Sequence, residues 1–567
     1  MSEGNEMIPV TNRSMNLADC RDSWFLDETY DCWCLEDILY TEKAEVPKFQ
    51  RLSIYAPKAY MNADGTPDRR GEAAGYTCAT APVVFVNSAA GYMQMPHTWL
   101  GGPRCNAEIY LERGMVYVTA GCRGRESRNA EGKAAGKSPA TLVDLKTVVR
   151  LLRHNREALP GDMEKIITVG ISAGGAMSSL LGSTGDNENY LPLLAGNGAF
   201  MEESDAVFAS QCYCPIIDLD HADQAYEWCF GADKTCEDSH AGPAETMDPF
   251  REALSAKLAE QYVGYINSLE LRHPATGEKL ILSRDGRSGS FYDYLMDCLG
   301  ESAAKFLKKL ERRELALSCS VADYLAGNYE EEVPAPRDHG PKDADMHHIG
   351  PGAELQNDGR EPKTPGEMMC RPPKGTPWRE MPRRMMKRKG KAKEEWLAWD
   401  GIRAKVKDLD IYVLQHRRRM KPCTSFDVLN GRSGENQVMG TGERDYMHYN
   451  PAVGKAIESL KEQFPAEAAE YGPAYDVGGD AELARRRYLI NPMNFIGTAE
   501  KNKMAEHFRI RVGAADADTS LSIAMTLAVR LANTGADADF AFVWDLPHCD
   551  ADYPGEILDW IDEICAK

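Results

Sequence analysis

The sequence lacks long apolar runs, and no segment approaches the roughly 20 consecutive apolar residues that a membrane-spanning helix needs. Its first six residues, Met-Ser-Glu-Gly-Asn-Glu, also lack the basic and apolar regions of a secretory signal. We therefore expect a protein that makes no use of a membrane. The cytoplasm is the expected location.

An excess of positive charge is missing as well. The chain has 66 Lys and Arg residues against 87 Asp and Glu residues, which gives a formal net charge of −21. This balance opposes a general affinity for nucleic acid or for an anionic membrane surface, so neither is expected as a partner. A small neutral or aromatic substrate fits better.

The cysteines show no spacing typical of a metal site. Sixteen cysteines are scattered over 567 residues. Two pairs, Cys32/Cys34 and Cys212/Cys214, have a single residue between their members, which is short for a structural zinc knuckle. We expect buried free thiols, with neither a metal nor an organic cofactor.

The first third of the chain has the pattern of strands and helices wound around a mostly parallel sheet. Apolar runs rich in β-branched residues predict strands at residues 51–55, 83–87, 116–120, 166–170 and 206–214. Between the third and fourth strands, apolar residues recur at helical spacing and predict a helix over residues 140–154.

This alternation of predicted strands and helices ends after about residue 217 and begins again near residue 487. Residues 249–265 and 303–315 are predicted helices in the interval. Residues 331–393 are crowded with Pro, Gly, Met and charge, including a basic run at 383–389, which favours a loose surface loop. The interval is predicted to be a large, mainly helical insertion (lid) domain, residues 219–486.

The end of the chain repeats the pattern of the first third. It contains a predicted strand at residues 508–512, a helix at 519–534, a strand at 539–544 and a helix at 555–564. We therefore predict an α/β fold whose core is discontinuous. Residues 1–218 form its first segment and residues 487–567 its second.

Residues 170–174 read Gly-Ile-Ser-Ala-Gly and match the motif GxSxG. An apolar strand candidate precedes the motif and a helix start rich in small residues follows it, which is the context that the motif requires. A turn this sharp leaves room only for glycine at positions 170 and 174. The pattern predicts an α/β-hydrolase fold with Ser172 as nucleophile; the alternative is a glycine-rich turn with an incidental serine.

In this fold an acid and a histidine follow the serine in that order, each after a late strand. Asp516 comes just after the strand at 508–512, with Asp518 and Asp550 as competing acids. His548 follows the last strand and is placed to take the proton of Ser172. The predicted triad is therefore Ser172, Asp516 and His548.

Acyl transfer also needs two hydrogen-bond donors for the oxyanion. The first is the backbone amide of Ala173, directly after the nucleophile. The second is expected from the loop at residues 87–92, where small residues let the backbone approach the substrate. We choose Gly91 within this loop, which lacks the usual HGGG sequence.

These motifs resemble those of the bacterial tannases. Residues 169–182, VGISAGGAMSSLLG, are similar to the nucleophile turn of that family. Five other stretches resemble corresponding stretches of the family and occur in the same order along the chain. They are residues 87–93, 121–125, 139–150, 509–520 and 544–548. The resemblance implies a serine esterase that hydrolyses galloyl esters, such as tannins and alkyl or catechin gallates, through an acyl-enzyme and releases gallic acid.

The resemblance also implies three residues that bind the galloyl ring. Lys421 and Glu435 lie in insertion segments similar to those that carry the family's lysine and glutamate, and Asp518 matches its aspartate near the triad acid. The chemistry is suitable, because three phenolic hydroxyls can donate to two carboxylates and accept from an ammonium group. Without the resemblance, a Lys or Glu in a charged insertion is usually solvated.

Several alternatives stay open at this point. The same triad would serve a feruloyl, chlorogenate or other aryl carboxylesterase, and a serine peptidase or a catalytically inactive binding module would share the fold. Residues 331–393 have no counterpart in the family pattern. The alcohol half of the ester and the oligomeric state are not specified by the sequence.

Overall fold

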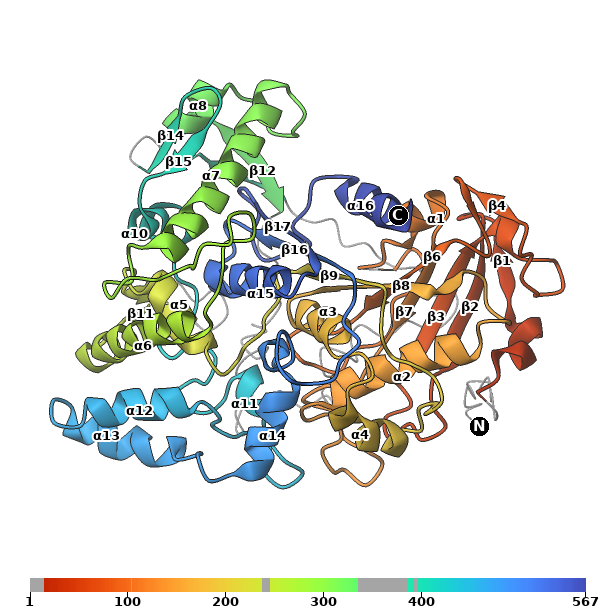
Figure 1. Cartoon of the computed structure of the whole chain (residues 1–567), viewed down its shortest axis with the longest axis horizontal. Coiled ribbons are helices and arrows are strands. Elements are labelled where there is room, and N and C mark those ends of the chain that lie inside the picture. The colour runs from red at the N-terminus through yellow and green to blue at the C-terminus, as the bar shows by residue number, and fades with distance from the viewer. Residues whose placement is uncertain (1–14, 103, 237–244, 335–384, 391–395, 567) are drawn as a thin grey trace, which may run out of the picture.

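The computed structural model describes residues 15–102, 104–236, 245–334, 385–390 and 396–566. A nine-stranded sheet flanked by helices forms the core, and a group of helices lies beside one end of it (Figure 1). The sheet consists of β1 (Phe25–Asp27), β2 (Cys32–Leu39), β3 (Arg51–Pro57), β6 (Pro82–Asn87), β7 (Val116–Ala120), β8 (Asp162–Ile171), β9 (Ala209–Tyr213), β16 (His507–Gly513) and β17 (Asp537–Val543).

The strand order is β1-β2-β3-β7-β6-β8-β9-β16-β17. Strands β1, β2, β3 and β7 pair antiparallel, and the strands from β7 to β17 pair parallel. The last two strands come from the end of the chain and continue the sheet directly beside β9. Consequently the carboxyl ends of β8, β9, β16 and β17 lie at one edge, where sheets of this kind carry their sites.

The α/β-hydrolase fold predicted from the sequence is confirmed, and all seven predicted core strands are present. Two strands at the edge, β1 and β2, were not predicted. In β2 the register shifts between Leu35 and Ile38, where the acidic pair Glu36 and Asp37 interrupts the apolar pattern. A bulge of this kind removes the strict alternation by which a strand is recognised.

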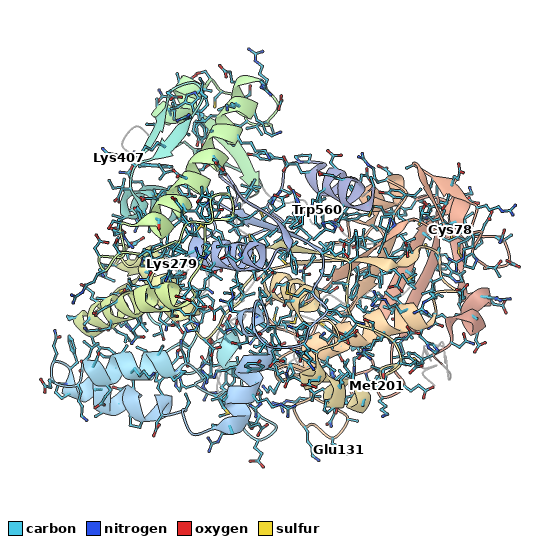
Figure 2. All side chains as sticks on the ribbon, in the orientation of Figure 1. Cys78, Glu131, Met201, Lys279, Lys407 and Trp560 are labelled. Atoms are coloured by element: carbon cyan, nitrogen blue, oxygen red, sulfur yellow. The ribbon has the colours of Figure 1, made fainter. Side chains whose placement is uncertain are left out.

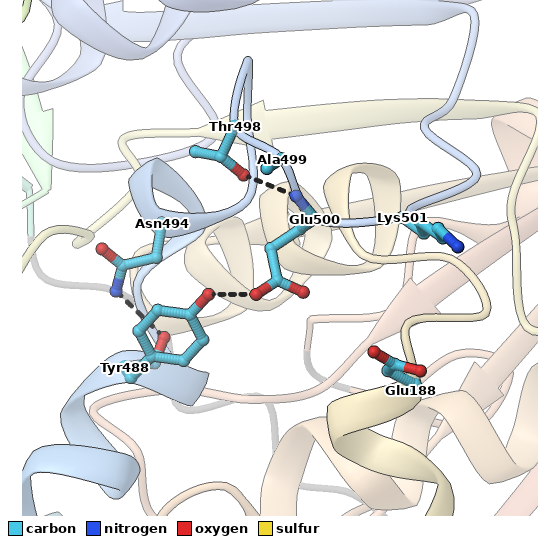
Figure 3. A pocket seen from close by; sticks show the side chains of 7 residues that line it. All are labelled: Glu188, Tyr488, Asn494, Thr498, Ala499, Glu500 and Lys501. Atoms are coloured by element: carbon cyan, nitrogen blue, oxygen red, sulfur yellow. Dashed lines mark hydrogen bonds between the residues drawn. The ribbon is translucent and has the colours of Figure 1, made fainter.

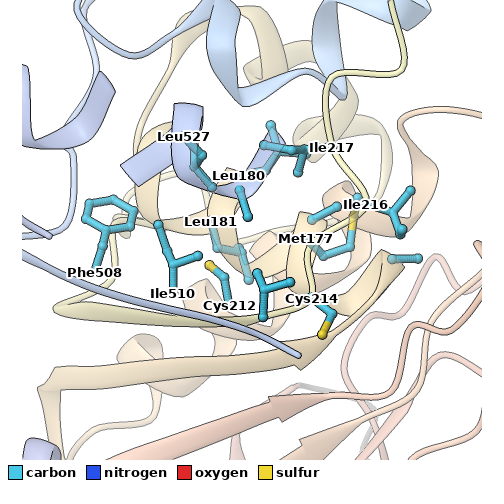
Figure 4. Close-up of a cluster of buried hydrophobic side chains, with 14 of the residues drawn as sticks. Met177, Leu180, Leu181, Cys212, Cys214, Ile216, Ile217, Phe508, Ile510 and Leu527 are labelled. Carbon is cyan, nitrogen blue, oxygen red and sulfur yellow. The ribbon is translucent and has the colours of Figure 1, made fainter. Parts of the chain in front are cut away.

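Helices cover both faces of the sheet. On one face, α1 (Ala107–Glu112) and α16 (Glu556–Ala566) pack on the strands, with Trp560 among the buried residues (Figure 2). On the other face lie α2 (Ala140–His154), α3 (Ala173–Ser183) and α15 (Leu521–Asn533). Figure 4 shows part of this second layer, where Leu180 and Leu181 of α3 and Leu527 of α15 meet the sheet residues Phe508 and Ile510.

Helix α2 has the bounds predicted from its apolar spacing, but it is buried on nearly every side. Its charged residues are therefore paired. Lys146 donates to Asp205 at 2.6 Å, and the Nε atom of Arg150 donates to the other oxygen of Asp205 at 2.8 Å. Burial acts to raise the pKa of Asp205, yet the two cations outweigh it and leave the pKa lowered.

The insertion is mainly helical, as predicted. Its helices are α5 (Ala222–Phe230), α6 (Pro249–Ser268), α7 (Ser290–Glu311), α8 (Val321–Ala326), α10 (Leu409–Tyr412), a π-helical turn (Val413–Arg417), α11 (Gly434–Val438), α12 (Pro451–Ser459), α13 (Pro465–Tyr471) and α14 (Ala481–Leu489). Helix α7 begins well before the predicted residue 303. The interruption in its pattern is Gly300, where a Cβ would lie 2.6 Å from the carbonyl oxygen of Ala404.

Short elements complete the structure. The strand pairs are β4 (Glu72–Ala73) with β5 (Tyr76–Thr77), β10 (Thr235–Cys236) with β11 (Glu245–Thr246), β12 (Glu330–Pro334) with β13 (Met385–Lys389), and β14 (Leu397–Trp399) with β15 (Ala404–Val406). The remaining helices are α4 (Leu191–Gly196) and the 3-10 turns Leu17–Ser23, Lys58–Tyr60, Glu188–Tyr190, Gly472–Tyr475 and Pro492–Asn494.

Two parts of the predicted loose loop at residues 331–393 pair as β12 and β13. Most of the basic run at 383–389 lies in β13, opposite the acidic residues of β12. The rest of the predicted loop, residues 335–384 and 391–393, lies outside the described residues.

Two further expectations concern cysteines and membranes. All the cysteines in the described ranges are free thiols, and most are buried, as predicted. Of the helices that the structure describes, none combines the length and the apolar character needed to cross a bilayer.

Candidate active site

Ser172 lies in a strained turn between β8 and α3. Its backbone has φ 62° and ψ −121°, and its amide donates to the carbonyl oxygen of Tyr213 at 2.9 Å. A Cβ at Gly170 would lie 2.1 Å from the carbonyl oxygen of Gly174, and one at Gly174 would lie 2.8 Å from that of Ala89. The expected need for two glycines is confirmed, and the turn has the strained strand-to-helix geometry that GxSxG predicts.

The side chain of Asn87 joins this turn to the end of β6. Its amide nitrogen lies 3.1 Å from the carbonyl oxygens of Val169 and Gly174 and 3.0 Å from the hydroxyl of Ser178. The strand that begins the predicted oxyanion loop is thereby tied to the strand and helix that hold Ser172. Sequence reasoning placed Asn87 in the loop but did not identify this role.

Asp516 and His548 form a buried pair. The Nδ1 atom of His548 lies 2.8 Å from Oδ2 of Asp516, and the other oxygen of Asp516 accepts the amide of Asp518 at 2.8 Å. Of the three acids considered from the sequence, Asp516 is therefore the one that contacts the histidine. Asp550 is exposed.

The electrostatics of the pair favour a charged imidazole. Burial acts to raise the pKa of Asp516, but the charge and hydrogen bond of His548 outweigh it, so this pKa is lowered. Burial acts to lower the pKa of His548, but Asp516 opposes it and holds that pKa well above its ordinary value. A base that is stabilised once it has accepted a proton is suited to general-base catalysis.

Ser172 and His548 are brought to the same edge of the sheet. The Ser172 amide donates to the carbonyl oxygen of Tyr213, and the sulfur of the next residue, Cys214, lies within 4.8 Å of a ring nitrogen of His548. In the structure as described, the Ser172 hydroxyl makes no hydrogen bond to His548. Such catalytic hydrogen bonds often tighten only when substrate binds.

Of the two predicted oxyanion donors, Ala173 directly follows Ser172, and the loop that contains Gly91 approaches the same turn at Ala89. Ala173 is the first residue of α3, and Gly91 lies in a turn closed by the amide of Met93, which donates to Ala90 at 2.9 Å. Gly91 has φ 53°, a left-handed conformation that glycine adopts without cost. Its carbonyl oxygen accepts Nε of Arg125 at 3.0 Å, which fixes the turn.

The three predicted galloyl-binding residues share one property: each is partly exposed. Lys421 lies in the insertion, with its ammonium nitrogen 3.9 Å from the ring centroid of Phe426. Glu435 is in the first turn of α11, and Asp518 is two residues after Asp516. Among the described residues, none of the three side chains has a hydrogen-bond partner, so their polar groups remain available to a ligand.

Tyr226 of α5 holds two of these residues on a common support. Its hydroxyl donates to the carbonyl oxygen of Ala517 at 2.9 Å and accepts the backbone amide of Lys421 at 3.0 Å. Ala517 lies between Asp516 and Asp518. One hydroxyl therefore fixes the segment of Lys421 against the loop that carries Asp518.

Two buried carboxylates extend this support to Glu435. Asp223, also on α5, accepts the amides of Ser425 and Phe426 at 2.8 Å each. Asp427 accepts Nδ2 of Asn436, next to Glu435, at 2.6 Å. Burial, and then the charge of Asp427, raise the pKa of Asp223 to about 6.

Comparison with known proteins shows what this chain is similar to. A family model described as BD-FAE, an α/β-hydrolase domain, matches residues 126–225. The tannin acyl hydrolase of Lactobacillus plantarum is 28% identical, with 94% of each chain covered and a TM-score of 0.69. The tannase of Fusobacterium nucleatum is 26% identical, over 94% of this chain and 95% of that one, with a TM-score of 0.68. The curated proteins contain no match.

The chain is a tannase-like carboxylic ester hydrolase. Both the family resemblance and the fold predicted from the sequence are confirmed. One further solved neighbour is a tannin acyl hydrolase in complex with ethyl gallate, 28% identical over 94% of both chains with a TM-score of 0.69.

A separate pocket of the tannase-like chain lies away from this site (Figure 3). It is lined by Glu188, Tyr488, Asn494, Thr498, Ala499, Glu500 and Lys501. Several of its polar groups bond to one another; for example, the Tyr488 hydroxyl donates to Glu500 at 2.7 Å. None of the predicted catalytic or galloyl-binding residues lines it, so we assign it no part in the chemistry.

Proposed function

We propose that this tannase-like hydrolase cleaves galloyl esters through an acyl-enzyme and releases gallic acid. The observation that carries the proposal is the buried Asp516–His548 pair beside the strained Ser172 turn, in a chain that resembles tannases over 94% of its length. One of those neighbours has ethyl gallate bound. Small phenolic esters are therefore the proposed ligands.

In the proposed mechanism, Ser172 attacks the ester carbonyl while Nε2 of His548 takes its proton. Asp516, bonded to Nδ1, stabilises the imidazolium. The amides of Ala173 and Gly91 receive the oxyanion. Collapse of the tetrahedral intermediate breaks the ester bond, and the alcohol leaves with the proton from His548.

The second half of the reaction uses the same groups on water. His548 takes a proton from water as the oxygen attacks the acyl carbonyl, and a second tetrahedral intermediate forms. Its collapse returns the proton to Ser172 and releases the free acid. No step requires a metal or an organic cofactor.

Lys421, Glu435 and Asp518 supply the proposed selectivity for the galloyl ring. The two carboxylates accept hydrogen bonds from phenolic hydroxyls, and the ammonium group of Lys421 donates to a phenolic oxygen. A site built to hydrogen-bond hydroxyls rejects an analogue without them, here by about 10³-fold or more, because its polar partners stay unpaired. Methoxylated aryl esters should therefore react poorly.

Hydrolysis of methyl gallate against methyl ferulate tests the proposal. Rapid release of gallic acid with little cleavage of the ferulate supports it. Equal rates would instead identify a feruloyl-type or general aryl carboxylesterase with the same triad.

The proposed domain organisation follows the sheet. We propose core segments at residues 1–218 and 487–567 and a lid at 219–486, because the nine strands come only from the first and third ranges. The cytoplasmic location expected from the sequence stays a prediction.

A further inference from the structure

A thiol that the proposed mechanism does not use lies against the triad. Cys214 follows β9 with a left-handed φ of 41°, and its side chain is fully buried. Its sulfur accepts the amide of Gly513 at 3.5 Å and lies within 4.8 Å of a ring nitrogen of His548. Figure 4 shows Cys214 at the end of the sheet layer that also contains Cys212.

Cys214, Asp516 and His548 together offer the donors of a metal site. One ligand atom from each side chain lies within 4.8 Å of the other two, and this is the single such group within the described ranges. A thiolate sulfur, an imidazole nitrogen and a carboxylate oxygen are the donors that Zn²⁺ prefers. Around a tetrahedral ion such donors stand about 3.5 Å apart, so only small shifts are needed.

We propose that these three side chains form an inhibitory site for Zn²⁺ or another thiophilic divalent cation. The side chain of His548 is 18% exposed, so an ion can reach the site from solvent at this side chain. Asp516 and Cys214 are fully buried. Binding forms metal bonds to the sulfur, an imidazole nitrogen and a carboxylate oxygen. It releases the thiol proton and the imidazole proton on that nitrogen to solvent, and no electron is transferred.

The inhibition rests on the proposed catalytic roles of the triad. A cation bonded to the imidazole makes the ring a much weaker base, so it no longer takes the proton of Ser172. The same ion also replaces the hydrogen bond from His548 to Asp516. Hard cations such as Mg²⁺ prefer oxygen donors and should not occupy the site.

Titration of the full-length enzyme with ZnCl₂, using methyl gallate hydrolysis as readout, tests the activity side of the proposal. We expect progressive loss of activity that a chelator reverses, and no loss at the same concentrations of MgCl₂. The variant Cys214→Ser keeps the size of the side chain but loses the soft donor. It should need at least about tenfold more Zn²⁺ for half-inhibition, relative to its own zinc-free rate.

Cys212→Ser is the matched control. This thiol is also buried at the end of the sheet, but its partner is Ser210 rather than the triad. The control should show the Zn²⁺ sensitivity of the wild type. Equal Zn²⁺ sensitivity in Cys214→Ser and the wild type would overturn the proposal, as would a wild type that resists Zn²⁺.

A direct binding measurement separates this proposal from the proposed function. Competition with a zinc indicator should show one equivalent of tightly bound Zn²⁺ fewer for Cys214→Ser than for the wild type and Cys212→Ser. This readout stands even if galloyl esters prove not to be the substrate. Identical stoichiometry in all three proteins would reject the site.

Discussion

The hydrolase core and the insertion hold their parts of the active site in different ways. In the core, Asp516 is fully buried and its carboxylate is occupied by His548 and a backbone amide. In the insertion, the side chains of Lys421 and Glu435 are partly exposed, and hydrogen bonds hold only the backbone of Lys421 and the side chain of Asn436 next to Glu435. The Asp516–His548 pair is therefore fixed before substrate arrives, whereas the proposed recognition depends on how the insertion is joined to the core.

The largest expected effect comes from the core. Ser172→Ala should lower kcat for methyl gallate by about 10⁶-fold, because the nucleophile is lost. Binding of gallate, measured by calorimetry, should change little, since the groups that bind the ring remain. Ser179→Ala is the control, as its hydroxyl bonds within the same helix to Ala176. Residual turnover near that of the wild type would remove Ser172 from its assigned role.

The next effect comes from the insertion. Lys421→Met and Glu435→Gln should each lower kcat/KM for methyl gallate by about 10- to 150-fold, the value of a hydrogen bond to a charged group. Reactivity of Ser172 toward a fluorophosphonate should persist, because the triad is intact. Lys455→Met, an exposed lysine of the insertion, should behave like the wild type. A parallel loss of labelling would mean that core and insertion are not separable.

The pH dependence sharpens the account of the core. His548 must be neutral to accept a proton, and Asp516 raises its pKa above the ordinary value near 6.5. Activity should therefore fall about tenfold per unit as the pH drops below this raised pKa. Asp516→Asn removes the negative charge that raises the pKa of His548. The kcat/KM of this variant should be much lower, and the acidic side of its pH profile should move to lower pH. Asp550→Asn should leave the acidic side of the pH profile of kcat/KM unchanged.

The smallest expected effect concerns the hydrogen bonds that connect the insertion to the core through Tyr226. Tyr226→Phe removes the hydroxyl that links Lys421 to Ala517, a loss of about 1 kcal/mol, or roughly fivefold. We expect KM for methyl gallate to rise while kcat stays nearly constant. Tyr262→Phe loses a buried hydroxyl bonded to Ser522 and is the matched control. A fall in kcat with KM unchanged would count against a positioning role.

The same contrast explains what the sequence predicts. Ser172 is found from a local motif, and Asp516 and His548 from the order of strands that a hydrolase requires. Helix α2 is found from its apolar spacing alone. These features depend on neighbours in sequence or on a general topology, so a single chain reveals them.

Recognition depends on contacts between distant segments, which leave no local pattern. The Tyr226 hydroxyl bonds to Lys421 and Ala517, which are 195 and 291 positions away in the sequence. In the sequence, Asp223 looks like an ordinary charged residue on a helix. Lys421 and Glu435 were predicted to bind the galloyl ring only from the family resemblance. The bulged strand β2 was missed for a related reason, because its acidic residues interrupt the pattern.

The most direct test of galloyl recognition is the ratio of kcat/KM for methyl gallate to that for methyl 3,4,5-trimethoxybenzoate. The two esters share a scissile bond and differ in the hydroxyl groups offered to Lys421, Glu435 and Asp518. We predict a ratio of about 10³ or more. A ratio near one would contradict the role of these three residues while leaving Ser172, Asp516 and His548 as the triad of a serine esterase.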